Sequence, residues 1–436
     1  MSKPVSVAVV GSGPAGFYTA ESLVKSGFPC EIDIIDRLPT PYGLIRGGVA
    51  PDHQTTKNVW RRYEKTALAD VVNFYGNIDI GRDISVEELR KHYDAVVLAI
   101  GSALDRPLGI PGEDKSGVFG AAAFVGWYNG HPDFRNLDPE LQTKAAAVIG
   151  VGNVAIDVAR VLAKTPAEMA ETDLADYAAE AIHASPLTDV YMFGRRGAAE
   201  AKFTNKELRE MGDLENCVPI IDKEQIPDEV TSEMSERDRR LTERNLGTLR
   251  EFAARDPEEK HKRVHFRFLA SPVEILGGER VEGLRLEKNE VVDGRARGTG
   301  EFFEIECGLV LPSIGYRAEP LAGVPYNESD GTAKSDDGRI ERGFYAVGWI
   351  RRGPTGVIGT NKPDGDVAYH QIEEDFDSGE KEGRPAFEAL LARRKLRAVT
   401  FEDWKKIEQV EIASAPAPAP RRKFTRVEDM LAALDA

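Results

Sequence analysis

The chain has 436 residues, of which 41% are hydrophobic and 8% aromatic, enough for two to three ordinary domains of roughly 150 residues. This composition excludes a wholly disordered chain, and glycine and proline are too scattered for a collagen or coiled-coil rod. Lys and Arg number 57 against 73 Asp and Glu. The formal net charge of −16 argues against a nucleic-acid or anionic-membrane binder.

Three cysteines, Cys30, Cys217 and Cys307, lie far apart and form neither a CxxC pair nor the spacing of an Fe–S or zinc site. We therefore expect reduced thiols, no metal site and a cytoplasmic, reducing compartment. No apolar run of about 20 residues predicts a membrane span. An apolar strand pattern begins at Val5, which leaves no room for a signal or transit peptide, although a processed form would look the same.

A strand, a glycine-rich turn, a helix and a second strand follow one another at the start of the chain. Residues 5–10 (VSVAVV) predict the first strand and residues 31–36 (EIDIID) the second. The turn between them is a G-x-G-x-x-G motif made of Gly11, Ser12, Gly13, Pro14, Ala15 and Gly16. Its glycines allow a tight turn, close approach to a pyrophosphate and packing of the helix on the strand.

Asp36 ends the second strand, 20 residues after Gly16, where an acid can bind ribose hydroxyls. The first motif therefore favours FAD or NAD. The alternative is a tight turn followed by an unrelated acid.

The same pattern returns at residues 145–150 (AAAVIG), followed by Gly152, Asn153, Val154 and a helix. No acid ends the next strand, 189–194; Arg195 and Arg196 follow it instead. A guanidinium pair at this position favours a 2′-phosphate and hence NADP(H). The alternative is two solvated charges at a strand end. A chain with one site for each coenzyme is most economically a flavoprotein that takes hydride from NADPH.

Residues 93–102 and 308–316 predict one further parallel strand for each unit, and residues 338–349 predict a return to the first. The predicted fold class is α/β, with two dinucleotide-binding, Rossmann-like domains, the NADP domain being inserted into the FAD domain. The expected crossings lie near 103–107 and 314–318. We assign 1–105 and 315–436 to the FAD domain and 106–314 to the NADP domain.

Four other segments carry weaker expectations. Residues 165–188 are expected to form a surface excursion, and the charged segment 228–263 is expected to be helical. ASAPAPAP (413–420) predicts a stiff, extended linker. Thr425 and Glu428 have the spacing of a capping box in front of a short terminal helix.

The chain resembles the adrenodoxin-reductase type of ferredoxin–NADP⁺ reductase nearly from end to end. The most specific segments are VAVVGSGPAGFYTA (7–20), PYGLIRGGVAPDH (41–53), GNVAIDVAR (152–160), GRRG (194–197), KFTNKELREM (202–211) and GWIRRGPTGVIGTN (348–361). The two glycine motifs alone would also fit flavoprotein disulfide reductases, but those need a redox dithiol that this chain lacks.

The resemblance implies cofactor contacts at particular positions. For FAD they are Gly11, Gly13, Pro14, Ala15, Gly16, Asp36, Leu44, Ile80, Trp349, Gly356, Val357 and Ile358. For NADP(H) they are Arg106, Gly152, Asn153, Val154, Arg195, Arg196 and Glu207, with Gly356 touching both cofactors. Asp36 stands where the family more commonly has Glu. Trp349 has an ordinary alternative as a core tryptophan, and Glu207 as the end of a capping box that begins at Thr204.

His53 and Glu210 match a pair that the family is thought to use near the nicotinamide for proton movement and positioning. A histidine titrates in the right range, and a nearby carboxylate can orient it. The alternatives are that His53 merely caps its loop and that Glu210 lies on a solvated helix face.

The electron acceptor must be external, because the sequence holds no Fe–S or haem motif, and the resemblance implies a ferredoxin-like iron–sulfur protein. Such acidic partners need a basic face, and we hypothesise that Arg240 and Arg244 contribute to it. Other candidates are Arg61 with Arg62 and Lys405 with Lys406; all of them could instead be solvated helix faces. The oligomeric state is open, with a monomer favoured.

Two other functions remain as alternatives to an NADPH–ferredoxin reductase. One is the electron-entry module of a larger complex, as in the glutamate-synthase small subunit, but such chains begin with cysteine clusters. The other is a nucleotide-binding redox sensor or scaffold without turnover.

Overall fold

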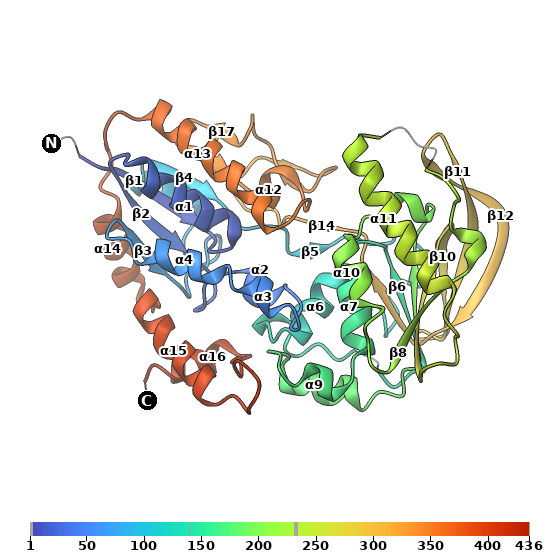
Figure 1. Cartoon of the computed structure of the whole chain (residues 1–436). Coiled ribbons are helices and arrows are strands. Elements are labelled where there is room, and N and C mark those ends of the chain that lie inside the picture. The colour runs from blue at the N-terminus through green and yellow to red at the C-terminus, as the bar shows by residue number, and fades with distance from the viewer. Residues whose placement is uncertain (1–2, 140, 231–233, 436) are drawn as a thin grey trace.

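A computed structural model describes residues 3–139, 141–230 and 234–435 and contains two mainly parallel sheets (Figure 1). The first sheet has the strand order β17-β18-β4-β1-β2-β3, and only the β17–β18 pair is antiparallel. Its strands are β1 (Val5–Val10), β2 (Cys30–Ile35), β3 (Val72–Tyr75), β4 (Ala95–Leu98), β17 (Arg339–Glu341) and β18 (Phe344–Ala346).

The second sheet is wholly parallel and has the order β13-β6-β7-β9-β8. Its strands are β6 (Ala145–Ile149), β7 (Asp189–Phe193), β8 (Cys217–Ile221), β9 (Lys262–Arg267) and β13 (Leu309–Pro312). An antiparallel ribbon follows β9 in the chain and consists of β10 (Ala270–Leu276), β11 (Gly283–Val292) and β12 (Arg295–Glu306).

Two short strands join the sheets. β5 (Leu104–Asp105) pairs in antiparallel fashion with β14 (Tyr316–Arg317), so the two chain crossings lie side by side (Figure 1). Every strand of the second sheet and of the ribbon lies between β5 and β14 in the sequence, whereas the first sheet takes strands from both sides of that stretch. A small hairpin, β15 (Tyr326–Asn327) with β16 (Thr332–Ala333), follows β14.

Helices cover the sheets. On the first sheet α1 (Pro14–Ser26) packs against α4 (Trp60–Ala67) and α13 (Asn361–Asp375). The remaining α-helices are α2 (Leu44–Gly47), α3 (Gln54–Lys57), α5 (Val86–His92), α6 (Ala121–Tyr128), α7 (Asn153–Ala163), α8 (Pro166–Met169), α9 (Asp176–His183), α10 (Asn205–Glu210), α11 (Glu236–Ala253), α12 (Trp349–Arg352), α14 (Arg384–Arg394), α15 (Phe401–Ala413) and α16 (Val427–Ala432). Short 3₁₀ turns are η1 (Pro132–Phe134), η2 (Ala198–Glu200), η3 (Lys223–Gln225) and η4 (Ile358–Thr360).

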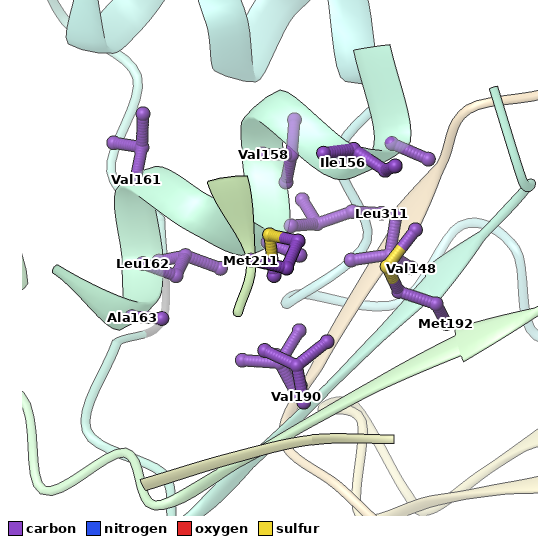
Figure 2. Packing of buried hydrophobic residues seen from close by; sticks show 14 of the residues in the cluster. Val148, Ile156, Val158, Val161, Leu162, Ala163, Val190, Met192, Met211 and Leu311 are labelled. Atoms are coloured by element: carbon purple, nitrogen blue, oxygen red, sulfur yellow. The ribbon is translucent and has the colours of Figure 1, made fainter. Parts of the chain in front are cut away.

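Apolar side chains on both faces of the parallel strands form the cores, as expected for sheets that helices cover. Figure 2 shows Ile156, Val158 and Leu162 of α7 on one side of the cluster and Val148, Val190 and Met192 of the second sheet on the other. Burial of each such side chain is worth about 1.5–3 kcal/mol, which holds α7 against β6. No helix in the described part of the chain has the length and apolar character needed to span a bilayer.

The prediction of a surface excursion at 165–188 is wrong. The segment contains α8 and α9, and Asp173 between them is buried. Its Oδ1 accepts hydrogen bonds from Lys57 Nζ at 2.6 Å and Gln54 Nε2 at 3.0 Å, and its Oδ2 lies 3.3 Å from Lys423 Nζ. The segment therefore packs against two distant parts of the chain, which its own composition could not indicate.

The prediction of an extended linker at 413–420 is also wrong. Residue 413 ends α15, and the Ala419 amide donates to the Pro416 carbonyl at 2.8 Å, so the chain turns. The returning segment is then held by the buried Glu411, whose carbonyl accepts from the Arg422 amide at 2.9 Å and whose Oε1 accepts from the Phe424 amide at 2.8 Å.

Two expectations about helices are corrected in part. The terminal helix exists, but Arg426 is its N-cap residue and no side chain caps it. Thr425 instead lies with its methyl group near Gly130, so the predicted capping box does not form. Within 228–263 the helix α11 covers 236–253 only; residues 231–233 of that prediction lie outside the described residues.

Candidate functional site: two glycine turns and the residues between them

The first glycine motif forms a tight turn at the carboxyl end of β1. Gly11 has φ +107°, and a Cβ there would lie 2.5 Å from the Ala99 carbonyl oxygen; a Cβ on Gly16 would lie 2.0 Å from the Gly11 carbonyl oxygen. Gly13 is the N-cap residue of α1, and a Cβ on it would meet nothing closer than Gly43 Cα at 4.0 Å. Two glycines are therefore required by packing, and the third leaves open space.

The start of α1 fits a pyrophosphate. No side chain caps the helix and no acidic residue occupies its first turn, which begins with Pro14 and Ala15. The first amide groups of a helix need acceptors, and an anion supplies them well. This cradle of open space in front of uncapped amides is the observation that fits FAD to these residues.

Asp36 lies beside this turn. Its Oδ2 accepts hydrogen bonds from the Ser12 amide at 2.8 Å and from the Ser12 hydroxyl, and its Oδ1 accepts from the Leu38 amide at 3.0 Å. The carboxylate is thus tied to the glycine turn at the end of β2, where the ribose of a dinucleotide lies in this architecture.

The segment 348–358 returns to the first glycine motif. Gly348 has φ +68°, and a Cβ there would lie 2.5 Å from the Cβ of Ala15. Trp349 begins α12 and stacks on the Tyr316 ring at 6.1 Å between centroids. Trp349 is only half-buried, so the alternative of a core tryptophan does not describe it.

The other residues predicted to contact FAD differ in how far their side chains are exposed. Leu44 begins α2 with 44% of its surface exposed, and Val357 is 61% exposed. Gly356 has φ +84° and lies against Thr360, next to Ile358 in the 3₁₀ turn η4. The side chain of Ile80, by contrast, is buried, so only its backbone is available to a ligand.

The second glycine motif repeats the arrangement. A Cβ on Gly150 would lie 2.3 Å from the Ser313 carbonyl oxygen, whereas Gly152, the N-cap residue of α7, has open space around it. No side chain caps α7 and no acid lies in its first turn. Asn153 Oδ1 accepts a hydrogen bond from the Thr204 amide at 2.8 Å, and Val154 packs on the core below.

Arg195 and Arg196 follow β7, and no ion pair joins either guanidinium to another described residue. Glu207 lies in the first turn of α10, and its Oε2 is buried without a hydrogen-bond partner among the described residues. The predicted alternative, a capping box with Thr204, does not form. Free guanidinium groups and an orphaned carboxylate oxygen beside an uncapped helix fit a phosphorylated nucleotide.

Arg106 lies at the crossing between the sheets. Its Nε donates to the Tyr316 carbonyl at 3.1 Å and its Nη2 to the Asp330 carbonyl at 2.7 Å. The structure thus uses its guanidinium to hold β5, β14 and the small hairpin together.

His53 and Glu210 meet between the two motifs. Nε2 of His53, at the end of the 41–53 loop, lies 2.8 Å from Oε2 of Glu210 at the end of α10. The His53 side chain caps no helix, and only 31% of the Glu210 side chain is exposed, so neither alternative describes the pair. Burial alone would raise the pKa of Glu210, but the His53 hydrogen bond and the Arg160 and Lys206 charges outweigh it and lower that pKa.

A buried ion network that the sequence analysis missed surrounds the pair. Arg160 of α7, 1% exposed, donates to both oxygens of Asp52 at 2.7 and 3.0 Å and lies 2.8 Å from Asp157 Oδ1. Asp157 Oδ1 in turn lies 3.9 Å from His53 Nδ1. The spacing of Asp157 and Arg160 on one helix face was the available signal. The network lines a cavity formed by Asp52, His53, Arg160, Lys164, Glu168, Glu210, Asp213 and Leu214.

The three cysteines take no part in the site. All three are free and buried, and burial raises the pKa of Cys30 to about 11 and those of Cys217 and Cys307 to about 12. Thiols of this kind are inert, so the chain holds no redox dithiol. The described residues include no cluster of His, Cys, Asp and Glu side chains that could hold a metal ion.

The chain matches known proteins over nearly all its length. The family model for pyridine nucleotide-disulphide oxidoreductases matches residues 5–357. NADPH-ferredoxin reductase FprA of Mycobacterium tuberculosis (strain CDC 1551) is 41% identical, with 98% of this chain and 99% of that protein covered. The mitochondrial NADPH:adrenodoxin oxidoreductase of Homo sapiens is 40% identical, with 98% and 92% covered.

Solved structures agree. The structure of Mycobacterium tuberculosis FprA in complex with NADPH has a TM-score of 0.95 and 39% identity to this chain, and all of both chains is covered. The chain therefore belongs to the pyridine nucleotide-disulphide oxidoreductase family and, within it, to the FAD- and NADP(H)-dependent enzymes of the adrenodoxin-reductase type.

Proposed function

We propose that this chain takes hydride from NADPH at the second glycine motif and delivers electrons, through FAD at the first, to a ferredoxin-type iron–sulfur protein. The contact between His53 and Glu210 carries the proposal. It joins the loop that follows the first nucleotide motif to the helix that follows the second, so the two nucleotide sites share one reaction centre. Bound FAD supplies the conversion of a two-electron donor into single electrons.

The protein's own groups bind and orient. The uncapped amides of α1 and α7 donate hydrogen bonds to the two pyrophosphates, and Asp36 holds the FAD ribose. Arg195 and Arg196 clamp the 2′-phosphate, and the orphaned Glu207 oxygen accepts from a hydroxyl or amide of the nucleotide. Leu44, Trp349 and the backbone of 356–358 line the FAD site.

His53 Nε2 and Glu210 Oε2 hold a proton between them at the centre of the site. Asp52 and Arg160 fix the backbone next to His53, since the buried bidentate pair ties the 41–53 loop to α7. The pair can therefore orient the nicotinamide and move a proton at His53 Nε2 without rearrangement of the surrounding chain.

The acceptor docks on a basic face that includes Arg240 and Arg244 of α11. Arg244 is exposed, and no ion pair joins it to another described residue, whereas Arg240 pairs with Glu236 one turn away. Among the other candidates Arg62 binds Glu21, Lys405 binds Glu64 and Glu408, and Lys406 binds Asp403. Arg61 is exposed, and its guanidinium lies over the Trp60 ring at 5.6 Å, so it stays a second candidate. A free cation keeps more of its attraction for an acidic partner.

The same proposal includes the domain division, the location and the assembly. Residues 1–105 and 315–436 form the FAD domain and 106–314 the NADP domain, with the β5–β14 pair as the hinge between them. Three free thiols support a reducing compartment, which we take to be the cytoplasm. The net charge of −16 favours a monomer that binds neither nucleic acid nor membrane.

One experiment tests the function. NADPH is added anaerobically to the purified yellow protein with cytochrome c as the reporter, with and without a ferredoxin from the same source. Cytochrome reduction that depends on ferredoxin supports the proposal. Flavin bleaching without stimulation by ferredoxin supports hydride transfer from NADPH to FAD and contradicts ferredoxin as the electron acceptor. The absence of bleaching contradicts both halves.

A further inference from the structure

The turn that carries Arg195 and Arg196 is held from one side by the antiparallel ribbon. Three consecutive carbonyls of this turn accept hydrogen bonds from that ribbon or from the residue before it. The Gly194 carbonyl accepts from the Ala270 amide at 3.1 Å, and the Arg196 carbonyl accepts from the Leu269 amide at 3.1 Å. Between them, the Arg195 carbonyl accepts from Asn289 Nδ2 at 2.8 Å.

The three hydrogen bonds differ in how far they depend on the identity of the donor residue. Two donors are backbone amides, which nearly any residue supplies. The third is a side chain, so residue identity matters only at Asn289. Asn289 is 8% exposed, and its Nδ2 also donates to Ser271 Oγ at 2.7 Å.

A local irregularity of the ribbon lies directly next to Asn289. The register of β11 against β12 shifts between Glu287 and Asn289, while on its other side the Asn289 amide donates to the Leu269 carbonyl at 2.7 Å, one residue beyond the Ala270–Lys288 pair of β10 and β11. Leu269 itself has φ +54°, an uncommon conformation for leucine. Bulges of this kind re-aim a side chain, and they are frequent next to binding sites.

We infer that Asn289 is a positioning residue for coenzyme selectivity: by holding the Arg195 carbonyl, it aims the Arg195 guanidinium at the 2′-phosphate of NADPH. The inference rests on the proposed binding of that phosphate by Arg195. A guanidinium with no other partner among the described residues has many rotamers available, so fixing its backbone reduces the entropy lost on binding. NADH, which lacks the phosphate, gains nothing from Asn289.

The test measures binding of 2′,5′-ADP and of 5′-AMP to the FAD-loaded full chain by titration calorimetry. Asn289→Ala and Asn289→Leu, the second of which keeps the volume, are each expected to weaken 2′,5′-ADP roughly three- to tenfold, the range for one lost hydrogen bond. Binding of 5′-AMP is expected to stay within about twofold. Ser271→Ala, which removes only the other bond of the same amide, is the matched control and leaves the preference for 2′,5′-ADP in place.

A double-mutant cycle separates positioning from general damage. In the Arg195→Ala background, Asn289→Ala is expected to have no further effect on 2′,5′-ADP, because Asn289 acts through Arg195. Additive losses, or equal losses for 2′,5′-ADP and 5′-AMP, overturn the inference, as does a loss in Asn289→Ala that Asn289→Leu does not share. If the wild-type chain itself fails to prefer 2′,5′-ADP, the proposed NADPH site fails instead.

Discussion

The imidazole of His53 and the carboxylate of Glu210 lie 2.8 Å apart although 157 positions separate them in the chain. His53 belongs to the loop after the first glycine motif and Glu210 to α10, after the second. A hydrogen bond between these two segments exists only when both nucleotide-binding units are folded and correctly placed. The pair therefore depends on the arrangement of the two units, and in the proposed function it lies at the centre of the site.

Glu210→Gln tests this centre. The amide keeps the size of the side chain but removes the charge that orients His53, so the kcat of NADPH-driven ferricyanide reduction is expected to fall at least about tenfold, with a smaller change in the KM for NADPH. Steady-state and stopped-flow kinetics measure this. Arg209→Gln, an exposed neighbour on α10, is the control. An unchanged kcat with a raised KM would make Glu210 a binding residue only.

The buried Asp52–Arg160 pair sets the stability of the same region. Arg160→Met leaves Asp52 in the interior with Lys164 alone, so the free energy of unfolding in urea is expected to fall by about 3–5 kcal/mol. The double variant with Asp52→Asn should recover part of this loss. Arg240→Met, which breaks an exposed pair, should cost less than about 1 kcal/mol.

The pH dependence of this pair follows from Asp52. Burial would raise the pKa of Asp52, but Arg160 and Lys164 hold it well below its usual range. A carboxyl with a depressed folded-state pKa stabilises the fold above its unfolded value of about 3.9 and loses that contribution as the pH falls further. The difference in the free energy of unfolding between wild type and the double variant Asp52→Asn/Arg160→Met should therefore be constant above about pH 5 and shrink below pH 4.

The sequence predicted the strands and the two nucleotide turns well, because those signals are local. A β-branched run, a glycine turn and an apolar helix face lie within about 30 residues, and each element was found within one or two positions. It also predicted that His53 and Glu210 matter, but only through a family resemblance, since no local pattern links the two.

The failures share one physical cause: partners far apart in the chain. Asp173 is buried because Lys57 and Lys423 meet it, and the segment after α15 turns because Glu411 accepts two of its amides. The role of Asn289 could not be predicted either, because in the sequence it is only an asparagine within a strand pattern. Its hydrogen bond to the Arg195 carbonyl is visible only in the structure.

The buried amine of Lys423 gives a test of the C-terminal segment. Burial lowers the pKa of Lys423 to about 7, with Asp173 opposing the shift and Lys57 and Arg46 adding to it. Between about pH 7 and the unfolded value of about 10.4, the unfolded chain holds more protons than the folded one. Stability therefore rises with pH in this window, by at most about 1.4 kcal/mol per pH unit for one proton.

Lys423→Met removes that dependence. Urea unfolding at pH 5.5, 6, 8 and 9.5 should show the free energy of unfolding of wild type rising relative to that of Lys423→Met from pH 6 upward, with no change between pH 5.5 and 6. Lys406→Met, at an exposed lysine, is the control and should run parallel to wild type across the window. A constant difference between wild type and Lys423→Met would show that the amine stays charged in the fold.

Arg195→Ala tests coenzyme choice directly. The loss of one charge-assisted bond to the 2′-phosphate is worth about 1.5–3 kcal/mol, so the KM for NADPH should rise roughly 10- to 100-fold. NADH is the internal control, and its KM should move little. Equal losses for both coenzymes would contradict the role given to Arg195.

Arg244→Glu tests the acceptor face. Charge reversal at an exposed site should raise the KM for ferredoxin roughly three- to tenfold at low ionic strength and make its salt dependence shallower, because rim charges act mainly on association. Ferricyanide, a small acceptor, needs no docking face, so its reduction should be unchanged. Arg295→Glu, at the start of β12, carries the same charge change at an exposed position outside α11 and controls for net charge. If Arg295→Glu weakens ferredoxin as much as Arg244→Glu does, the effect comes from overall charge, and α11 is not the docking face.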